Sequence, residues 1–212
     1  MTGETRARAA QAGAAALDRF YPIFDHPDWL RRALPLGVKL VQLRIKDAPP
    51  EVLRPAIAAA QALCRRHGAV LVVNDHWQLA IELGCDWLHL GQEDLETADL
   101  GAIRRAGLRL GISTHDHAEL DRALSLGPDY VALGPVYPTT LKRMKWHRQG
   151  LGRLREWKAL VGDLPLVAIG GMRVDRAAGA FAAGADIVSA ISDITAHPDP
   201  EARIAEWIAA TR

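Results

Sequence analysis

The sequence contains little cysteine, almost no net charge and no long hydrophobic run. Its two cysteines, Cys64 and Cys85, are too few and too far apart for a disulfide framework or a Cys-x-x-Cys site, and they fit a reducing, cytoplasmic setting. A formal net charge of +1 gives no reason to expect a nucleic-acid or membrane partner. No apolar run approaches the roughly 20 residues that cross a bilayer. What remains is ordinary globular composition, with 49% hydrophobic and 24% charged residues.

The first 18 residues are rich in alanine and differ from the rest of the chain. They lack the unbroken apolar core of a secretion signal, so we expect residues 1–18 to be a leading helix or a disordered end. No linker or low-complexity segment interrupts residues 19–212, which we expect to form one domain. The sequence leaves the oligomeric state open, including a homo-oligomer.

A recurring pattern along the chain predicts alternating strands and helices. Six segments begin with glycine and run into an apolar stretch, and each glycine follows an amphipathic stretch, as expected of a helix C-cap before a strand. With one segment added near each end, the predicted strands lie within residues 19–24, 37–43, 68–75, 84–92, 107–113, 127–135, 164–171 and 184–192. A helical candidate follows each strand, and the last covers about 199–210.

Eight strand–helix units in one uninterrupted chain predict an α/β fold, a single (β/α)8 TIM barrel. Alternating elements of this kind require parallel strands joined by right-handed crossovers. The alternative is an open doubly wound sheet, which is disfavoured because no G-x-G-x-x-G turn follows the first strand. In a barrel, the active site is expected at the carboxyl ends of the strands.

Polar residues gather at those predicted strand ends. Gln42, Arg44 and Lys46 are spaced two apart, so they share one face of the second strand. Asp75 and Asp94 follow the third and fourth strands, and two carboxylates held close together require a proton or a cation between them. With Lys142, Asn74 and Ser113, the set describes a Mg²⁺–diphosphate site. The alternative is that the two aspartates form ion pairs with Arg44 and Lys46 and bind nothing.

A second anion site is indicated at the seventh and eighth strands. The loops there are the frequent phosphate site of such barrels. Gly170 and Gly171 would let the main chain approach a phosphate closely, and Ser189 and Ser192 follow nearby. A tight turn explains the paired glycines about equally well.

These motifs together resemble the thiamine phosphate synthase family. No single motif is specific, but their order and spacing jointly are, from residue 42 to about 190. The matching stretches are 42–46 (QLRIK), 74–75 (ND), 89–94 (HLGQED), 111–115 (GISTH), 134–135 (GP) and 168–171 (AIGG). The resemblance implies the barrel fold and a transferase that joins an aminopyrimidine methyl diphosphate to a thiazole phosphate, giving thiamine phosphate and diphosphate. It also implies a dissociative, Mg²⁺-assisted substitution.

The resemblance assigns roles residue by residue. It implies that Asp75 and Asp94 coordinate Mg²⁺, and that Arg44, Lys46, Ser113 and Lys142 are catalytic. It further implies a substrate-binding set comprising Gln42, Leu43, Arg44, Ile45, Lys46, Asn74, Ser113, Thr139, Thr140, Leu141, Lys142, Gly170, Gly171, Val188 and Ser189.

Two positions depart from the family pattern. The phosphate loop of the family usually reads Pro-Thr-x-Thr-Lys, and here Leu141 occupies the place of the second threonine. Trp87 stands where a small residue is more usual. The connection over residues 134–150 exceeds the length at which loops are often lids, about 12–15 residues, so we expect it to close over the substrates. For its basic residues beyond Lys142, a merely solvated loop is the alternative.

The histidines have structural interpretations. His115 and His117 form an H-x-H pair that could bind zinc only with further ligands, and we expect capping or exposure instead. His89, within a strand, is expected to be a hydrogen-bonded core histidine. The rival functions are an isomerase of the thiazole phosphate, a non-catalytic binder of thiazole or thiamine phosphate, and an isomerase of sugar phosphates.

Overall fold

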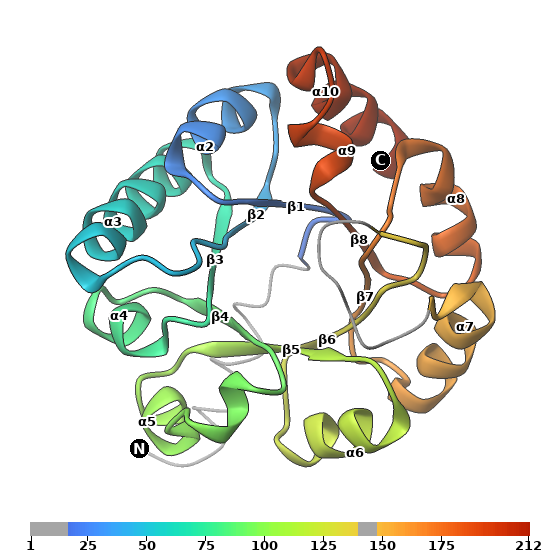
Figure 1. Cartoon of the computed structure of the whole chain (residues 1–212), viewed down its shortest axis with the longest axis horizontal. Helices are drawn as coiled ribbons and strands as arrows, with labels where there is room; N and C mark the ends of the chain where they lie inside the picture. Colours follow the sequence, from blue (N-terminus) through green and yellow to red (C-terminus); the bar gives the residue numbers. More distant parts are fainter. Residues whose placement is uncertain (1–16, 140–147) are drawn as a thin grey trace, which may run out of the picture.

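The computed structural model describes residues 17–139 and 148–212, and these form a closed barrel of eight parallel strands (Figure 1). Each strand pairs with its neighbours in sequence, and β1 closes the ring by pairing with β8. The strands are β1 (Phe20–Phe24), β2 (Leu40–Leu43), β3 (Val70–Asn74), β4 (Trp87–Leu90), β5 (Arg109–Thr114), β6 (Tyr130–Leu133), β7 (Leu166–Ala168) and β8 (Ile187–Ala190). The (β/α)8 prediction is confirmed, and seven predicted segments contain a whole strand, while the eighth, 107–113, stops one residue before the end of β5.

Helices surround the barrel and connect consecutive strands (Figure 1). The C-cap prediction holds at Gly68, which ends its helix in a left-handed conformation with φ +60°. Side chains of Asp99, Asp116 and Asp199 cap helix N-termini by accepting backbone N–H bonds. The helices are α2 (Pro27–Ala33), α3 (Pro50–His67), α4 (Trp77–Glu82), α5 (Leu100–Arg105), α6 (His117–Ser125), α7 (Gly150–Val161), α8 (Val174–Ala182), α9 (Ser192–Thr195) and α10 (Pro200–Thr211), with 3₁₀ turns η1 (Leu34–Leu36) and η2 (Asp94–Glu96).

The core has two layers, because alternate residues of each strand face the barrel interior and the surrounding helices. On β4, Leu88 and Leu90 pack in the outer layer, whereas Trp87 belongs to the inner one. The Trp87 ring lies 6.1 Å from that of Tyr130, and the guanidinium of Arg109 lies 5.2 Å from its centroid. The Trp87 side chain, which stands where the family usually has a small residue, therefore fills part of the barrel interior.

The first and last units of the barrel are joined on the outside. Phe20 of β1 stacks on Trp207 of α10 with ring centroids 5.3 Å apart. Arg32 of α2 makes two hydrogen bonds to the carboxylate of Glu201 on α10, the longer of them 2.9 Å. These contacts stabilise the barrel where β1 pairs with β8, the one neighbouring pair of strands that is not consecutive in sequence.

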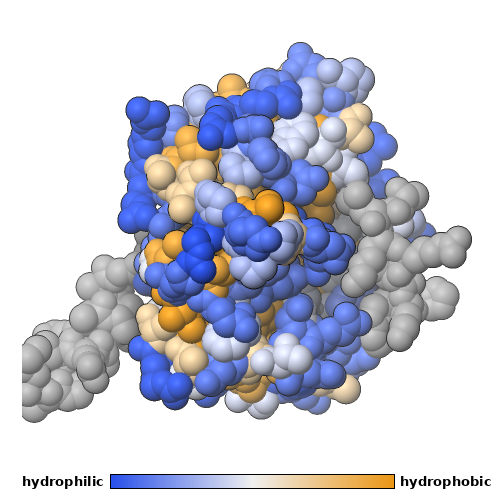
Figure 2. Space-filling view, turned by 60° about the vertical axis from the view of Figure 1, so that its left-hand side comes forward, coloured by the Kyte–Doolittle hydropathy of each residue, from blue (hydrophilic) through white to orange (hydrophobic). Residues whose placement is uncertain are grey.

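The face of the molecule seen in Figure 2 is mainly hydrophilic, with hydrophobic side chains in small groups. The large hydrophobic residues exposed among those described are Leu36, Val52 and Leu160. Within residues 17–139 and 148–212, we find no helix with the length and apolar character needed to span a bilayer.

Candidate active site

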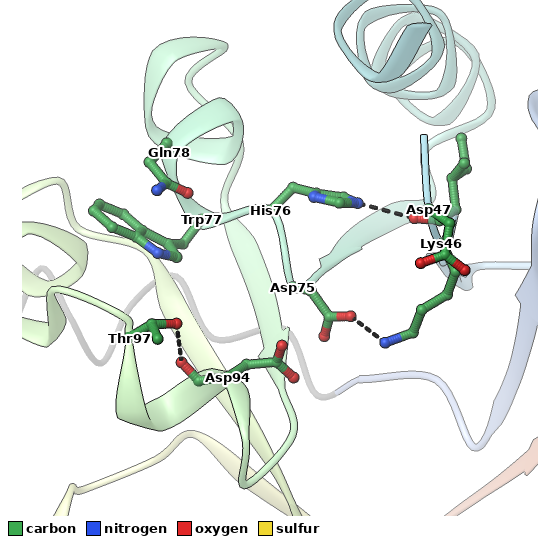
Figure 3. A pocket seen from close by; sticks show the side chains of 9 residues that line it. Lys46, Asp47, Asp75, His76, Trp77, Gln78, Asp94 and Thr97 are labelled. Carbon is green, nitrogen blue, oxygen red and sulfur yellow. Dashed lines mark hydrogen bonds and ion pairs between the residues drawn. The ribbon is translucent and has the colours of Figure 1, made fainter. Parts of the chain in front are cut away.

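A cavity of about 370 Å³ opens beside the carboxyl ends of β2, β3 and β4. Lys46 enters it from the loop after β2, Asp75 from the loop after β3, and Asp94 from the turn after β4. Figure 3 shows the Asp75 carboxylate directed at the Lys46 ammonium, with the Asp94 carboxylate turned toward the same space. Residues from three separate strand–helix loops thus meet at one rim, as the barrel prediction required.

Asp75 is held in an unusual backbone conformation. Its φ of +64° lies in the left-handed region, which aspartate tolerates better than most residues other than glycine. The Asp75 N–H donates to the carbonyl of His89 at 3.0 Å, and its Oδ2 accepts from Lys46 Nζ at 2.7 Å. Burial acts to raise the pKa of Asp75, but the hydrogen bond and charge of Lys46 outweigh it and lower the pKa. Asp75 is therefore a stable anion at the rim.

Asp94 shows the opposite behaviour. Its Oδ2 accepts a hydrogen bond from the Gly91 N–H at 3.0 Å, and a Cβ on Gly91 would approach that same oxygen to 2.9 Å. Burial, followed by the negative charge of Asp75, raises the pKa of Asp94. The two carboxyl groups are close enough to hydrogen-bond to each other.

This pair fits a magnesium ion. Within the described parts of the chain, no cluster of three or more His, Cys, Asp or Glu side chains is placed to hold a metal. Mg²⁺ needs no such cluster, since it is usually bound by one or two carboxylates together with substrate phosphates and water. Two facing carboxylates, one of which resists ionisation beside the other, are a donor set that a divalent cation would stabilise.

The three polar residues predicted to share one face of the second strand lie at different depths: one in the barrel interior and the other two toward the rim. Gln42 is buried, and its Nε2 donates to the Tyr21 hydroxyl at 2.8 Å. Arg44 is half-buried, and Lys46 is exposed and ion-paired to Asp75. The ion pair expected by the non-functional alternative is thus present for Lys46 and Asp75.

A chain of hydrogen bonds crosses the barrel interior below the rim. Gln42 bonds to Tyr21, and the hydroxyls of Tyr21 and Tyr130 lie 2.9 Å apart. His89 Nδ1 lies 2.9 Å from the Tyr130 hydroxyl, and its Nε2 lies 2.8 Å from Ser113 Oγ. Burial lowers the pKa of His89 to about 4, so the ring is neutral at physiological pH.

This arrangement confirms the structural reading of His89 and adds residues that the sequence interpretation missed. Tyr21 and Tyr130 were not expected to connect Gln42 with Ser113. Their inward strand positions were the available signal, but that signal does not say which residues meet across a closed barrel.

Several buried polar atoms on the strands and loops of the barrel have no hydrogen-bond partner among the described residues. Asn74 Nδ2, at the end of β3, and Ser189 Oγ, on β8, are potential donors in this state, and Gln92 Oε1 is an acceptor. Buried polar groups are normally paired, so unpaired donors of this kind are available to a polar ligand. An anionic substrate would satisfy the two donors.

The glycine turn after β7 is tightly enclosed. Gly171 has φ +62°, and a Cβ there would approach the carbonyl oxygen of Pro138 to 2.4 Å. The Tyr137 N–H donates to the carbonyl of Gly170 at 3.0 Å, which ties the β6 loop to the β7 loop. Arg176 reinforces the junction, because it donates to the Gly171 carbonyl and lies 4.6 Å from the centroid of the Tyr137 ring.

Not every residue in the implied substrate set can contact a substrate through its side chain. The side chains of Leu43 and Val188 belong to the outer core layer, whereas Ile45 packs against that layer and also lines the cavity. The main chains of Leu43 and Val188, rather than their side chains, would face a ligand. Thr139 is half-buried at the end of the described β6 loop.

Part of the predicted site lies outside the described residues. Thr140, Leu141 and Lys142 fall there, together with most of the predicted lid, so their roles and the closing of residues 134–150 stay predictions. The proposed helix or disordered end over residues 1–18 also falls largely outside.

His115 and His117 have the structural roles expected for them. His115 Nδ1 and the His115 N–H both lie within hydrogen-bonding distance of Glu119 Oε2, at 2.7 and 2.8 Å. His117 Nε2 lies 2.7 Å from Glu156 Oε1 at the surface. The first pair is a capping interaction at the start of α6, and the second joins α6 to α7.

Comparison with known proteins decides the family. Residues 20–194 match the profile of the family described as thiamine monophosphate synthase. The chain belongs to this family. It is 59% identical over 195 residues to a thiamine-phosphate synthase of Rhizobium etli, an alignment that covers 92% of this chain and 96% of the relative. It is 50% identical over 188 residues to the thiamine-phosphate synthase of Serratia proteamaculans, which covers 89% of each chain.

A solved structure agrees. The thiamine phosphate pyrophosphorylase of Pyrococcus furiosus superposes with a TM-score of 0.81 at 28% identity, over 91% of this chain and 95% of that one. The family resemblance inferred from the motifs is confirmed. So is the prediction of a transferase of thiamine biosynthesis, and the isomerase and binder alternatives are not favoured.

Proposed function

We propose that this chain joins 4-amino-2-methyl-5-(diphosphooxymethyl)pyrimidine to thiazole phosphate, forming thiamine phosphate and releasing diphosphate. The observation that supports this most is the meeting of Lys46, Asp75 and Asp94 at one cavity on the rim. Family membership and the names of the relatives support the same reaction. A site for a sugar phosphate would not need two acidic residues beside several cations.

The bound diphosphate would be held by Arg44 and Lys46, with Asn74 Nδ2 supplying a neutral donor. Arg44 is suited to a phosphate because its planar guanidinium offers several N–H donors. Lys46 would exchange its bond to Asp75 for a bond to the substrate, which is plausible because its side chain is 46% exposed. Lys142 is proposed as a further cation on the ground of the family resemblance.

We propose Asp75 and Asp94 as the magnesium ligands. When bound, a Mg²⁺ ion would supply positive charge that stabilises the leaving diphosphate. The ammonium of Lys46, released from Asp75, would then lie beside the same oxygens. The amide of Gln42, fixed by Tyr21, would orient the pyrimidine.

The proposed substitution is dissociative. The bond between the pyrimidine methylene carbon and the diphosphate oxygen breaks, and the electron pair leaves with the diphosphate. The thiazole nitrogen then donates its lone pair to the methylene carbon and forms the new C–N bond. No nucleophilic side chain is needed, so the chain's task is to position both rings and to stabilise the departing anion.

The thiazole phosphate is proposed to bind at Gly170, Gly171, Ser189 and Thr139. Gly171 has no side chain to separate its main chain from a ligand at the junction of the β6 and β7 loops. The buried hydroxyl of Ser189 has no hydrogen-bond partner among the described residues. The main chain of Val188 lies beside this hydroxyl. Two free, buried cysteines support a reducing, cytoplasmic location for the enzyme.

The purified protein, incubated with both substrates with and without Mg²⁺, tests this function. We expect thiamine phosphate and diphosphate to form in equal amounts, only when both substrates and Mg²⁺ are present. Isomerisation of the thiazole phosphate without diphosphate release would replace the synthase with the isomerase. Calorimetric binding of thiazole phosphate without turnover would identify a binder instead.

A further inference from the structure

The hydrogen bonds inside the barrel allow one continuous donor order. Gln42 Nε2 donates to the Tyr21 hydroxyl, and the Tyr21 and Tyr130 hydroxyls lie 2.9 Å apart. If Tyr21 donates to Tyr130, the Tyr130 proton is directed at Nδ1 of His89, 2.9 Å away. A neutral ring would then carry its proton on Nε2 and donate to Ser113 Oγ at 2.8 Å. In this order each hydroxyl accepts one bond and donates one, and the Ser113 proton points out of the chain of hydrogen bonds.

We infer that His89 and Tyr130 are positioning residues that fix the Ser113 hydroxyl as a donor toward the substrate diphosphate. The inference rests on the proposed function, because it assumes that an anion lies beside Ser113. A hydroxyl that already accepts a bond from His89 has one proton left to donate, and an anionic oxygen is the acceptor that gains most from it. Donors aimed in advance at a developing charge lower the barrier more than donors that must reorient.

Packing keeps the chain in place. The Tyr130 ring lies parallel to the His89 ring at 5.6 Å and meets the Tyr21 ring edge-on at 6.1 Å. Gly111 on β5 makes room for it, because a Cβ at that position would lie 2.0 Å from the Tyr130 ring. Tyr130 is fully buried, so its hydroxyl has little freedom to choose other partners.

Ser113 is also held through its main chain. Gln92 Nε2 donates to the Ser113 carbonyl at 2.7 Å. Two side chains from β4 and its following loop, His89 and Gln92, therefore hold one residue of β5 from its side chain and from its backbone. Such double support is what an oriented catalytic group requires.

A double-mutant cycle tests the inference through kcat. We expect His89→Leu and Ser113→Ala each to lower kcat on the order of tenfold, with the KM for thiazole phosphate little changed. If His89 acts through Ser113, the double variant is no slower than Ser113→Ala alone. Multiplied losses in the double variant would overturn the inference. His89→Gln, which can still donate to Ser113, should recover part of the activity that His89→Leu loses.

Thr114→Val is the matched structural control. Thr114 is the next residue on β5, but its hydroxyl is bonded on the outer side, to the Ala132 carbonyl at 3.0 Å and the Trp157 indole at 2.9 Å. We expect this variant to lose stability while kcat stays within twofold of the wild type. If Thr114→Val lost as much kcat as His89→Leu, removal of any buried polar group near β5 would slow the reaction, and the inference would fail.

Nitrogen NMR of the wild-type protein tests the direction without turnover. We expect the ¹⁵N shifts of His89 to show the proton on Nε2, and Tyr130→Phe, which keeps the ring, to abolish this preference. A proton on Nδ1 in the wild type would contradict the direction. The NMR measurement needs no substrate, so it tests the inference alone. Failure of the proposed function would appear separately, as a lack of diphosphate release by the wild-type protein.

Discussion

The carboxyl groups of Asp75 and Asp94 face each other across the rim of the barrel and have opposite pKa shifts. The pKa of Asp75 is lowered because Lys46 overcomes the effect of burial, and that of Asp94 is raised by burial and by the Asp75 charge. A positive charge placed between the two carboxyl groups would offset their repulsion and favour the ionised form of both. This is the electrostatic character expected of a divalent cation site that is completed by substrate phosphates.

Asp75→Asn should lower Mg²⁺-dependent diphosphate release by about 100-fold or more, an effect typical of removing a charged group from the reaction centre. Asparagine is the informative substitution, because it tolerates the φ of +64° and removes only the charge. The rate of diphosphate release over a Mg²⁺ series measures the effect.

Asp47→Asn is the control for that variant. Asp47 is exposed, also has a positive φ of +55°, and lies in the neighbouring loop. We expect its activity to change by a few-fold at most. Equal losses in the two variants would mean that general charge at the rim, rather than metal binding by Asp75, supports the reaction.

Gly111→Ala should destabilise the fold by about 3 kcal/mol, the upper range of overpacking, and lower activity as well. The added methyl would meet the Tyr130 ring at 2.0 Å. Chemical unfolding measures the loss. In the matched variant Gly152→Ala, on α7, nothing lies within 4 Å of the new Cβ, so stability should stay the same or rise by up to about 1 kcal/mol. Similar behaviour of the two variants would contradict the packing around Tyr130.

Arg32→Gln should lower the melting temperature more at neutral pH than in acid, where only the contact of Arg32 with the Trp29 ring, 4.5 Å from its centroid, is lost. The hydrogen bonds from Arg32 lower the pKa of Glu201 in the folded chain, so the pair stabilises the fold above about pH 4.3, the ordinary glutamate pKa. This contribution is lost as the pH falls through the lowered pKa. Arg31→Gln is the control, since Arg31 bonds to Asp28 within its own helix. A difference from wild type that is as large at the lowest pH as at neutral pH would disprove the assignment.

Neither thiol should react with a water-soluble disulfide reagent in the native protein at pH 8. Burial raises the pKa of Cys64 to about 12 and, with some help from the Asp86 charge, that of Cys85 to about 11. Both thiols should react at once in denaturant, and the absorbance of the released reagent counts them. A thiol that reacts rapidly in the native state would show that the barrel opens near it.

The fold and the general place of the site could be predicted from sequence. Glycine followed by an apolar strand marks six of the eight units. A closed parallel barrel brings all strand carboxyl ends to one rim, which is why Lys46, Asp75 and Asp94 were expected to meet, as they do at the cavity.

The interior could not be predicted in the same way. Tyr21 and Tyr130 are 109 residues apart, and their hydroxyls meet only after β1 and β6 have closed into one barrel. The left-handed backbone of Asp75 has no sequence signature, because aspartate adopts ordinary conformations far more often. Which of the two core layers a side chain joins depends on strand register, so the sequence did not show that the side chains of Leu43 and Val188 face the helices; their contact with a substrate stays a prediction.

A crystal of the protein soaked with Mg²⁺ and diphosphate would show where both bind. We expect one metal ion bound by oxygens of Asp75, Asp94 and the diphosphate, with Arg44 and Lys46 on the diphosphate and the bond from Lys46 to Asp75 broken. Diphosphate bound elsewhere, or a Lys46–Asp75 ion pair that persists with no metal between the two aspartates, would contradict this expectation.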